Sequence, residues 1–271
     1  MPGQIHIGPQ NGSLVLAGGG ELGEIYRKFV ALAGGSSAPI VLVPTAAERD
    51  YSGLYAPDME AFMQAGAHNL NLLHTRDREV ADSEKFSSRL RDAQGVWFSG
   101  GRHWRVTDAY LNTRTHDELF ALLDRGGAIG GSSAGATLQG TFMIRGDTSG
   151  AEIIIGDHVK GFGFLRNVSI DQHHLVRNRH YDMLEVVEAH PELLGIGIDE
   201  GTAIVVHGDE FEVLGRSYVA IYDNQRTFGR AGRFYFLRSG DRYNMHTREI
   251  LEPEVNVRGF DRLRSETREE K

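Results

Sequence analysis

Residues 128–136 read AIGGSSAGA, a short apolar run that leads into Gly131-Ser132-Ser133-Ala134-Gly135. This pentapeptide fits the pattern G-x-S-x-G, which is typical of a serine nucleophile on a sharp turn between a strand and a helix. Glycines permit the strained backbone, and the first N–H groups of the helix are free to hold an oxyanion. A turn of small residues that only packs a helix on a strand gives the same pattern. The context favours Ser133 as a nucleophile, because the flanking sequence predicts a helix over 115–125, a strand over 128–130 and a helix over 134–139.

The sequence before this turn alternates between predicted strands and predicted helices. Apolar runs predict strands at 13–17, 40–43, 69–73 and 95–98, and the segments between them predict helices at 21–33, 57–65, 83–92 and 103–111. Such alternation predicts a three-layer α/β sandwich with a mostly parallel central sheet and helices on both faces. Thr115 and Glu118 also form a capping-box pattern for the helix that precedes the nucleophile.

After the turn the pattern changes to short strands, predicted at 153–155, 168–170, 194–198, 202–206 and 211–214, with one helix at 181–190. Successive strands joined by turns predict an antiparallel C-terminal extension of the main sheet. No linker or repeat interrupts the chain, so we expect residues 1–271 to form a single α/β domain. Residues 1–12 and the charged residues 258–271 are expected to be a flexible arm and a flexible tail.

Composition excludes several classes of function. The formal net charge of −8 argues against a nucleic-acid-binding surface, although local arginine clusters can still bind anions. The absence of cysteine excludes disulfides, thiolate metal sites and a cysteine nucleophile. No segment approaches the ~18 apolar residues of a membrane helix, and Met1 to Gly12 lacks the features of a secretory leader. We therefore expect a cytoplasmic protein with no membrane partner.

A second reading of the N-terminal turn is a dinucleotide site, because Gly18, Gly20 and Gly23 fit G-x-G-x-x-G after a strand. The next strand ends in Pro44-Thr45, where a dinucleotide fold would offer an acidic residue to a ribose hydroxyl. A dinucleotide site is therefore a weaker hypothesis than a serine nucleophile at Ser133.

A serine nucleophile requires a base and an acid that orients the base. Among the twelve histidines, His173 stands out because Asp171-Gln172-His173-His174 directly follows a predicted strand. Asp199 and Glu200 end another predicted strand, and either carboxylate could orient the base or lie in an ordinary turn. Arg177 and Arg179 follow the candidate base, and their guanidinium groups suit carboxylate recognition.

Three ordered motifs resemble the cyanophycinases, a family of serine peptidases related to aspartyl dipeptidase. They are residues 131–136, residues 171–173 with Arg177 and Arg179, and residues 197–203, which read GIDEGTA. The resemblance runs from about Ser13 to Tyr222. It implies a fold like that of the class I glutamine amidotransferases, with serine in place of cysteine, and it implies a homodimer. It also implies hydrolysis of cyanophycin, a polyaspartate that carries arginine on its β-carboxylates, with no metal or organic cofactor.

The resemblance further implies roles for individual residues. It makes Ser133, His173 and Glu200 a catalytic triad, with the amides of Ala134 and Gly101 as the oxyanion hole. It places Asp171, Gln172, Arg177 and Arg179 among the groups that bind an aspartate-rich and arginine-rich peptide.

Two expected substrate contacts depart from the family pattern. His103 stands where the family has glutamine, and Asp182 stands where it has a third arginine. We expect His103 to make its subsite sensitive to pH near neutrality, and Asp182 to favour a cationic group on the substrate. Two alternatives therefore remain open: an aspartyl or isoaspartyl dipeptidase with a different substrate, and a catalytically silent relative that binds aspartyl peptides.

Overall fold

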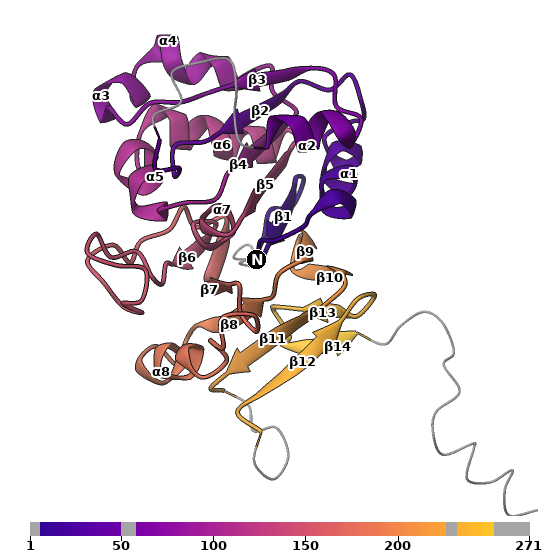
Figure 1. Cartoon of the computed structure of the whole chain (residues 1–271), viewed down its shortest axis with the longest axis vertical. Coiled ribbons are helices and arrows are strands. Elements are labelled where there is room, and N and C mark those ends of the chain that lie inside the picture. The colour runs from indigo at the N-terminus through magenta and orange to yellow at the C-terminus, as the bar shows by residue number, and fades with distance from the viewer. Residues whose placement is uncertain (1–5, 50–57, 226–231, 252–271) are drawn as a thin grey trace, which may run out of the picture.

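The protein is represented by a computed structural model that describes residues 6–49, 58–225 and 232–251 (Figure 1). In chain order its elements are β1 (Ser13–Ala17), α1 (Gly23–Leu32), β2 (Ile40–Val43), α2 (Met59–Gln64), β3 (Leu70–Leu72), α3 (Arg78–Ala81), α4 (Glu84–Ser87), the 3₁₀ turn η1 (Ser88–Leu90), β4 (Gly95–Phe98), α5 (His103–Tyr110), α6 (Arg114–Asp124), β5 (Ala128–Ser132), α7 (Ala134–Thr137), β6 (Gly140–Phe142), β7 (Leu165–Gln172), α8 (Asp182–Ala189), β8 (Leu194–Ile198), β9 (Thr202–His207), β10 (Glu210–Gly215), β11 (Tyr218–Asp223), β12 (Phe234–Arg238), β13 (Arg242–Asn244) and β14 (Glu249–Leu251).

Over the described residues, the main sheet has the strand order β14-β13-β10-β9-β1-β5-β4-β2-β3. The strands β1, β5, β4, β2 and β3 are mutually parallel, so their carboxyl ends meet at one edge of the sheet. The strand β9 pairs antiparallel with β1, and β10, β13 and β14 continue in antiparallel pairing. The predicted α/β class with mostly parallel pairing in the first half of the chain is confirmed.

Side-chain alternation along β1 explains why helices cover both faces of this sheet. Val15 and Ala17 belong to an apolar cluster with α1 and α2, while Leu14 and Leu16 belong to a second cluster with α5 and α6. On α1, the buried residues Ile25, Tyr26, Phe29 and Val30 form one helical stripe. The two groups of helices lie on opposite sides of the main sheet in Figure 1.

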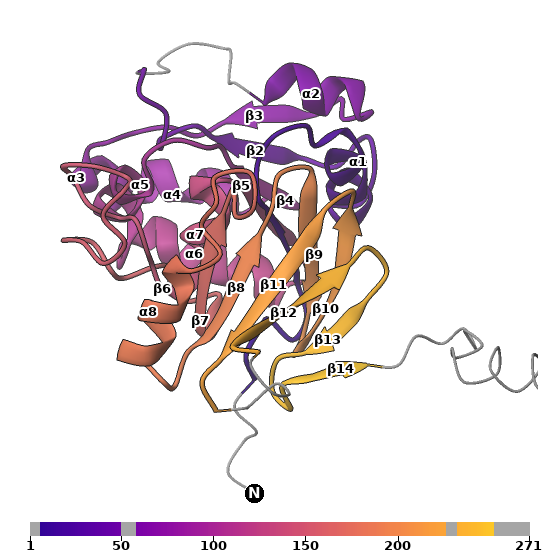
Figure 2. The same cartoon turned by 60° about the horizontal axis from the view of Figure 1, so that its bottom comes forward.

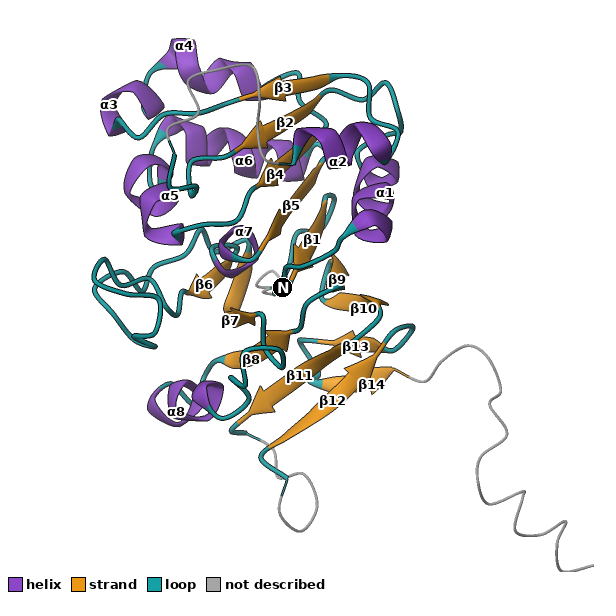
Figure 3. Cartoon of the chain, viewed as in Figure 1, coloured by secondary structure: helices purple, strands orange, loops and turns teal. Residues whose placement is uncertain are grey.

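The second half of the chain contributes a separate sheet with the order β12-β11-β8-β7-β6. Its strands β6, β7 and β8 are parallel, and β8, β11 and β12 are antiparallel. Figure 2 shows β8, β11 and β12 in front of the main sheet, and Figure 3 shows how few helices this region has. Ile170 of β7 and Ile196 of β8 share one core with Leu14 of β1. The prediction that 168–170 and 194–198 extend the main sheet is wrong, because these strands pack on its face instead.

Three smaller expectations also differ from the structure. Ile153 and Ile155 are exposed in a turn region rather than in a strand. The capping box does not form, because the Thr115 hydroxyl donates to the Ala81 carbonyl at 2.6 Å while Glu118 pairs with Arg91 at 2.9 Å. Residues 6–12 are held to the β9–β10 turn, where the Ile7 N–H donates to the Asp209 carboxylate at 2.6 Å. Residues 1–5 and the tail 258–271 lie outside the described residues.

Within the ranges 6–49, 58–225 and 232–251, no helix has the length and apolar character needed to cross a bilayer.

Candidate active site

Ser133 lies between the end of β5 and the start of α7 in a strained conformation, with φ 54° and ψ −116°. The turn leaves no room for a side chain at Gly131 or at Gly135. A Cβ at Gly131 would lie 2.3 Å from the Gly135 carbonyl oxygen, and a Cβ at Gly135 would lie 2.1 Å from the Phe98 carbonyl oxygen. A non-glycine residue at positive φ is held only where the surrounding structure enforces it. The glycines of the G-x-S-x-G motif therefore place Ser133 at the carboxyl edge of the parallel strands.

The predicted base and acid meet this serine. His173 Nε2 lies 2.9 Å from Ser133 Oγ, and His173 Nδ1 lies 2.5 Å from Glu200 Oε1. Serine, imidazole and carboxylate thus form one continuous line of hydrogen bonds. The glutamate side chain keeps a 32% exposed fraction, and the imidazole is nearly buried.

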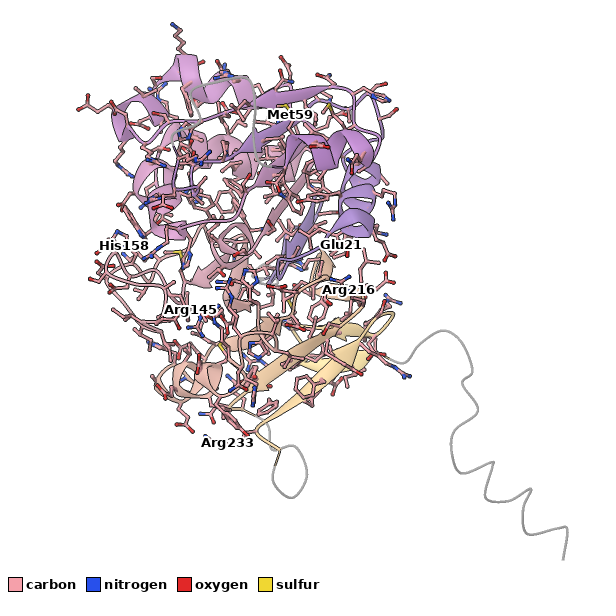
Figure 4. The ribbon with its side chains drawn as sticks, viewed as in Figure 1. Glu21, Met59, Arg145, His158, Arg216 and Arg233 are labelled. Carbon is pink, nitrogen blue, oxygen red and sulfur yellow. The ribbon has the colours of Figure 1, made fainter. Side chains whose placement is uncertain are left out.

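The glycine-rich turn after β1 holds both partners of the serine. The His173 N–H donates to the Gly18 carbonyl at 3.0 Å, and the Gly201 N–H donates to the Gly19 carbonyl at 2.8 Å. A Cβ at Gly19 would lie 2.3 Å from His173 Cε1, and one at Gly20 would lie 2.9 Å from Glu200 Oε2. The motif that resembles a dinucleotide site is therefore packed against the imidazole and the carboxylate. The adjacent Glu21 forms an exposed ion pair with Arg216 at 2.8 Å (Figure 4).

Asp199 and Glu200 are adjacent but have different partners. The Asp199 carboxylate accepts hydrogen bonds from the N–H groups of Leu175 and Val176, both at 2.9 Å, and from the Ser217 hydroxyl at 2.6 Å. Burial opposes ionisation of Asp199, but these donors outweigh it and lower the pKa of the carboxyl. Asp199 therefore fixes the loop after His173, while Glu200 meets the imidazole itself.

The surroundings of His173 favour the neutral form of its imidazole. Burial lowers its pKa, and the nearby cations Arg177 and Arg179 lower it further, while the hydrogen bond to Glu200 raises it. The net direction is below the ordinary value, which favours the neutral form that can accept a proton from Ser133.

Ala134 and Gly101, the residues expected to supply the oxyanion hole, lie in the two turns next to Ser133. Ala134 is the first residue of α7, so its N–H has no preceding helical carbonyl to pair with. Gly100 lies against the nucleophile, since a Cβ there would be 3.3 Å from Ser133 Cβ. Gly101 follows with φ 142°, and a Cβ on it would lie 2.1 Å from the Ala46 carbonyl oxygen. The turn after β4 is thus shaped to approach Ser133.

Asp171 lies behind the site and is completely buried. Its carboxylate binds Arg145 Nε at 2.9 Å and His174 Nδ1 at 3.1 Å, and it lies 3.7 Å from Arg179. The other Arg145 nitrogen donates to Asp182 at 2.5 Å. Arg145 lies above α8 in the view of Figure 4. Arg145 was missed by sequence analysis, because no motif surrounds it and its partners meet it only in the fold.

The remaining expected substrate contacts divide into one exposed and several buried residues. Arg177 is exposed beside His173. Arg179 is buried and donates to the backbone and side-chain oxygens of the nearly buried Gln172, at 2.9 and 3.2 Å. The two arginines therefore do not present a pair of open guanidinium groups.

His103 also differs from expectation. It is buried on α5, with Nε2 2.7 Å from the Ile144 carbonyl. Burial lowers its pKa to about 4, so the expectation that His103 titrates near neutrality is wrong. Asp182 is held by Arg145, which reduces the negative charge that it offers to a cationic group. Over the described ranges, no group of three or more histidine and acidic side chains is placed to hold a metal ion.

Comparison with known proteins identifies the kind of enzyme. A cyanophycinase from Geminocystis herdmanii is 31% identical over 246 residues, which cover 84% of this chain and 90% of the relative. A cyanophycinase from a Nostoc species is 32% identical over 247 residues, with 84% and 82% coverage. The crystal structure of a peptidase from an acI-B1 actinobacterium superposes with a TM-score of 0.64 at 26% identity, covering 88% of this chain and 98% of that one.

The fold and these relatives define the molecule as a hydrolytic peptidase of the serine type. The model of peptidase family S51 matches residues 14–214. The chain belongs to this family.

Proposed function

We propose that the enzyme hydrolyses aspartyl peptides that contain β-linkages, and that cyanophycin, from which it would release β-aspartyl-arginine dipeptides, is its first candidate substrate. The observation that carries the chemistry is the line of hydrogen bonds from Ser133 through His173 to Glu200. The named cyanophycinases among its relatives support the substrate class.

The proposed reaction is acyl transfer in two halves. His173 Nε2 takes the hydroxyl proton as Ser133 Oγ attacks the carbonyl carbon, and the resulting oxyanion accepts hydrogen bonds from the N–H groups of Ala134 and Gly101. When the intermediate collapses, His173 gives its proton to the leaving amine and the acyl group stays on Ser133. A water molecule, deprotonated by His173, then attacks the acyl carbonyl; the bond to Ser133 Oγ breaks, His173 returns the proton to Oγ, and the acid product leaves. Glu200 holds Nδ1–H and stabilises the imidazolium in both halves.

Arg177 is the proposed contact for a free substrate carboxylate, because its guanidinium is exposed beside the base. Asp171, Gln172 and Arg179 are proposed to support this surface from beneath, since their polar atoms bind one another. We further propose that the chain acts as one catalytic domain of the glutamine amidotransferase type, because β5, β7 and the β8–β9 turn supply the triad. The homodimer and the cytoplasmic location implied by the resemblance also remain proposals.

A fluorophosphonate probe tests the chemistry, and a panel of substrates tests specificity. We expect the probe to label the wild type and the Ser132→Ala control, but not Ser133→Ala. Cyanophycin and matched α-aspartyl and β-aspartyl dipeptides are then compared by kcat/KM. Labelling without cleavage of cyanophycin would indicate a dipeptidase with another substrate. Absence of labelling in folded protein would favour a silent peptide-binding relative.

A further inference from the structure

Three arginines gather on the side of the oxyanion turn that faces away from the triad. Arg76 follows β3, and Arg102 and Arg105 lie at the start of α5. The side chains of Arg76 and Arg105 both bind the turn at residues 46–49, which follows β2. The Arg102 N–H donates to the Ala46 carbonyl at 2.7 Å, which joins this turn to the one that carries Gly101.

The guanidinium groups of Arg76 and Arg105 are held close together by a shared neutral acceptor. Arg76 Nη2 lies 2.6 Å from the Ala47 carbonyl oxygen, and Arg105 Nη1 lies 2.9 Å from the same oxygen. The two nitrogens are therefore no more than about 5.5 Å apart. Arg76 also donates to the carbonyls of Glu48 and Arg49, and Arg105 lies 5.3 Å from the Trp104 ring centroid. These contacts hold the two cations through uncharged groups, namely backbone carbonyls and an aromatic ring.

Among the described residues, no carboxylate forms an ion pair with Arg76, Arg102 or Arg105. The Arg102 side chain donates to the Asp147 backbone carbonyl, and its Nε is buried without a hydrogen-bond partner. Partial shielding from water lowers the pKa of Arg105, Arg76 and Arg102 lower it further by repulsion, and Glu48 raises it from nearby. An anion placed here would relieve this repulsion between like charges.

The spacing of the strands gives an approximate distance between the arginine cluster and Ser133. Ser133 follows β5, and β4 separates β5 from β2 in the sheet. Neighbouring strands are ~4.8 Å apart, so the turn after β2 is roughly 10 Å from Ser133 along the carboxyl edge. An extended peptide covers this span in about three residues. The triad partners His173 and Glu200 are on the opposite side of Ser133, so a substrate can cross the edge without displacing them.

We propose that Arg76 and Arg105, supported by Arg102, bind a second carboxylate of an acidic peptide substrate, about three residues from the scissile bond. The proposal rests on the proposed function only in taking the substrate to be a peptide. It would give the enzyme a reason to prefer longer acidic chains over dipeptides. The contact is a fork-shaped, charge-assisted one of the kind that arginine makes with carboxylates.

Binding to Ser133→Ala tests this site without turnover. Fluorescently labelled peptides share one β-aspartyl bond and carry either aspartate or asparagine two to four residues from it, on either side. We expect at least one aspartate peptide to bind about tenfold tighter than its asparagine partner, and the preference to weaken with salt. Adding Arg76→Gln and Arg105→Gln should remove the preference. Equal binding of every pair, or a preference that survives both changes, would overturn the proposal.

Arg125→Gln is the matched control. Arg125 also donates to backbone carbonyls, those of Leu90 and Ala93, but it follows α6 at the opposite edge of the sheet. Its loss should leave the preference intact. Because Arg76 and Arg105 also hold a turn, the lysine pair Arg76→Lys and Arg105→Lys is measured too. It retains charge and should retain part of the preference, and complete loss with lysine would contradict an electrostatic site.

The same peptides separate this proposal from the proposed function. If active enzyme leaves the peptides uncut while Ser133→Ala prefers aspartate, the proposed function fails and the binding site stands. If the active enzyme cleaves the peptides while Ser133→Ala shows no preference for aspartate, the proposed function stands and the binding site fails.

Discussion

The adjacent residues His173 and His174 belong to two different groups of charged side chains. His173 and Glu200 lie beside Ser133, and the glutamate side chain is 32% exposed. Asp171, His174 and Arg145 are almost completely buried. Both groups join a histidine to a carboxylate, yet only the first reaches the nucleophile. The residue types do not distinguish catalytic from structural groups here. The distinguishing features are the direction of each side chain and the amount of water left around it.

In the buried group of Asp171, His174 and Arg145, the charge of the carboxylate is compensated by its two partners. Burial opposes ionisation of Asp171, but hydrogen bonds and charge from His174 and Arg145 outweigh burial and lower its pKa. The Tyr222 hydroxyl extends the network by meeting His174 Nε2 at 2.7 Å and donating to the His180 carbonyl at 2.7 Å. Substitutions in this group should therefore change the free energy of unfolding more than the reaction rate. Substitutions in the triad should change the reaction rate more than the free energy of unfolding.

Ser133→Ala should give the largest effect on activity. We expect kcat/KM on the panel substrate that the wild type cleaves best to fall at least ~10³-fold, with the melting temperature within a few degrees of wild type, because the elbow is shaped by its glycines. Retained turnover would remove Ser133 from the mechanism.

Asp171→Asn should give the largest effect on stability. Removing one partner leaves Arg145 and His174 buried with less compensation, and we expect unfolding in urea to lose about 3 kcal/mol. Labelling of Ser133 by the probe should persist in the folded fraction. A variant as stable as wild type would show that the buried group contributes little to folding.

Glu200→Gln should reduce kcat by roughly 10²-fold, since the imidazole loses the charge that orients and stabilises it. Asp199→Asn is the matched comparison, because Asp199 binds the loop after His173 rather than the ring. We expect a smaller effect on kcat and a larger one on thermal stability. If Asp199→Asn is the crippling change, the assignment of the acid is reversed.

The smallest expected effect is a shift in the pH dependence of kcat/KM. His173 must be neutral to act as base, so kcat/KM falls as pH decreases through its pKa, which lies below the ordinary 6.5. Arg177→Gln removes a cation that disfavours the imidazolium, so the acid limb should move to higher pH by less than about one unit. Arg125→Gln should leave the limb in place. A shift of the Arg177 variant to lower pH would contradict the charge assignment.

Local signals predicted much of this molecule, and contacts between distant segments account for the rest. The strands 40–43, 95–98 and 194–198 have the predicted bounds, because each is an apolar run that becomes fully buried. Nothing local distinguishes β7 and β8 from strands of the main sheet, since only their packing against Leu14 and Leu16 places them in a second one. Thr115 and Glu118 fit a capping box, yet Ala81 and Arg91 from other elements bind them instead.

The candidate site also combines features that local motifs predict with features that depend on contacts between distant segments. The motifs predicted the serine, the histidine and a pair of carboxylates, and the residues alone left Asp199 and Glu200 open. The contact of 2.5 Å to His173 and the donors around Asp199 distinguish them. Arg145 and the burial of Asp171 could not be predicted, because a carboxylate after a strand has the same sequence signal whether it meets water or a buried arginine.

A ribosome makes the nucleophile of this enzyme well before its base and acid. At about 5–20 residues per second, residue 200 follows residue 133 by roughly 3–13 s. The strand β1 gains its partner β9 only after residues 202–206 have emerged, and the Gly19 carbonyl then receives the Gly201 N–H. Until that moment the nascent chain lacks the backbone contact between Gly201 and Gly19 that positions Glu200. We therefore expect peptidase activity to begin only once β9 has been made.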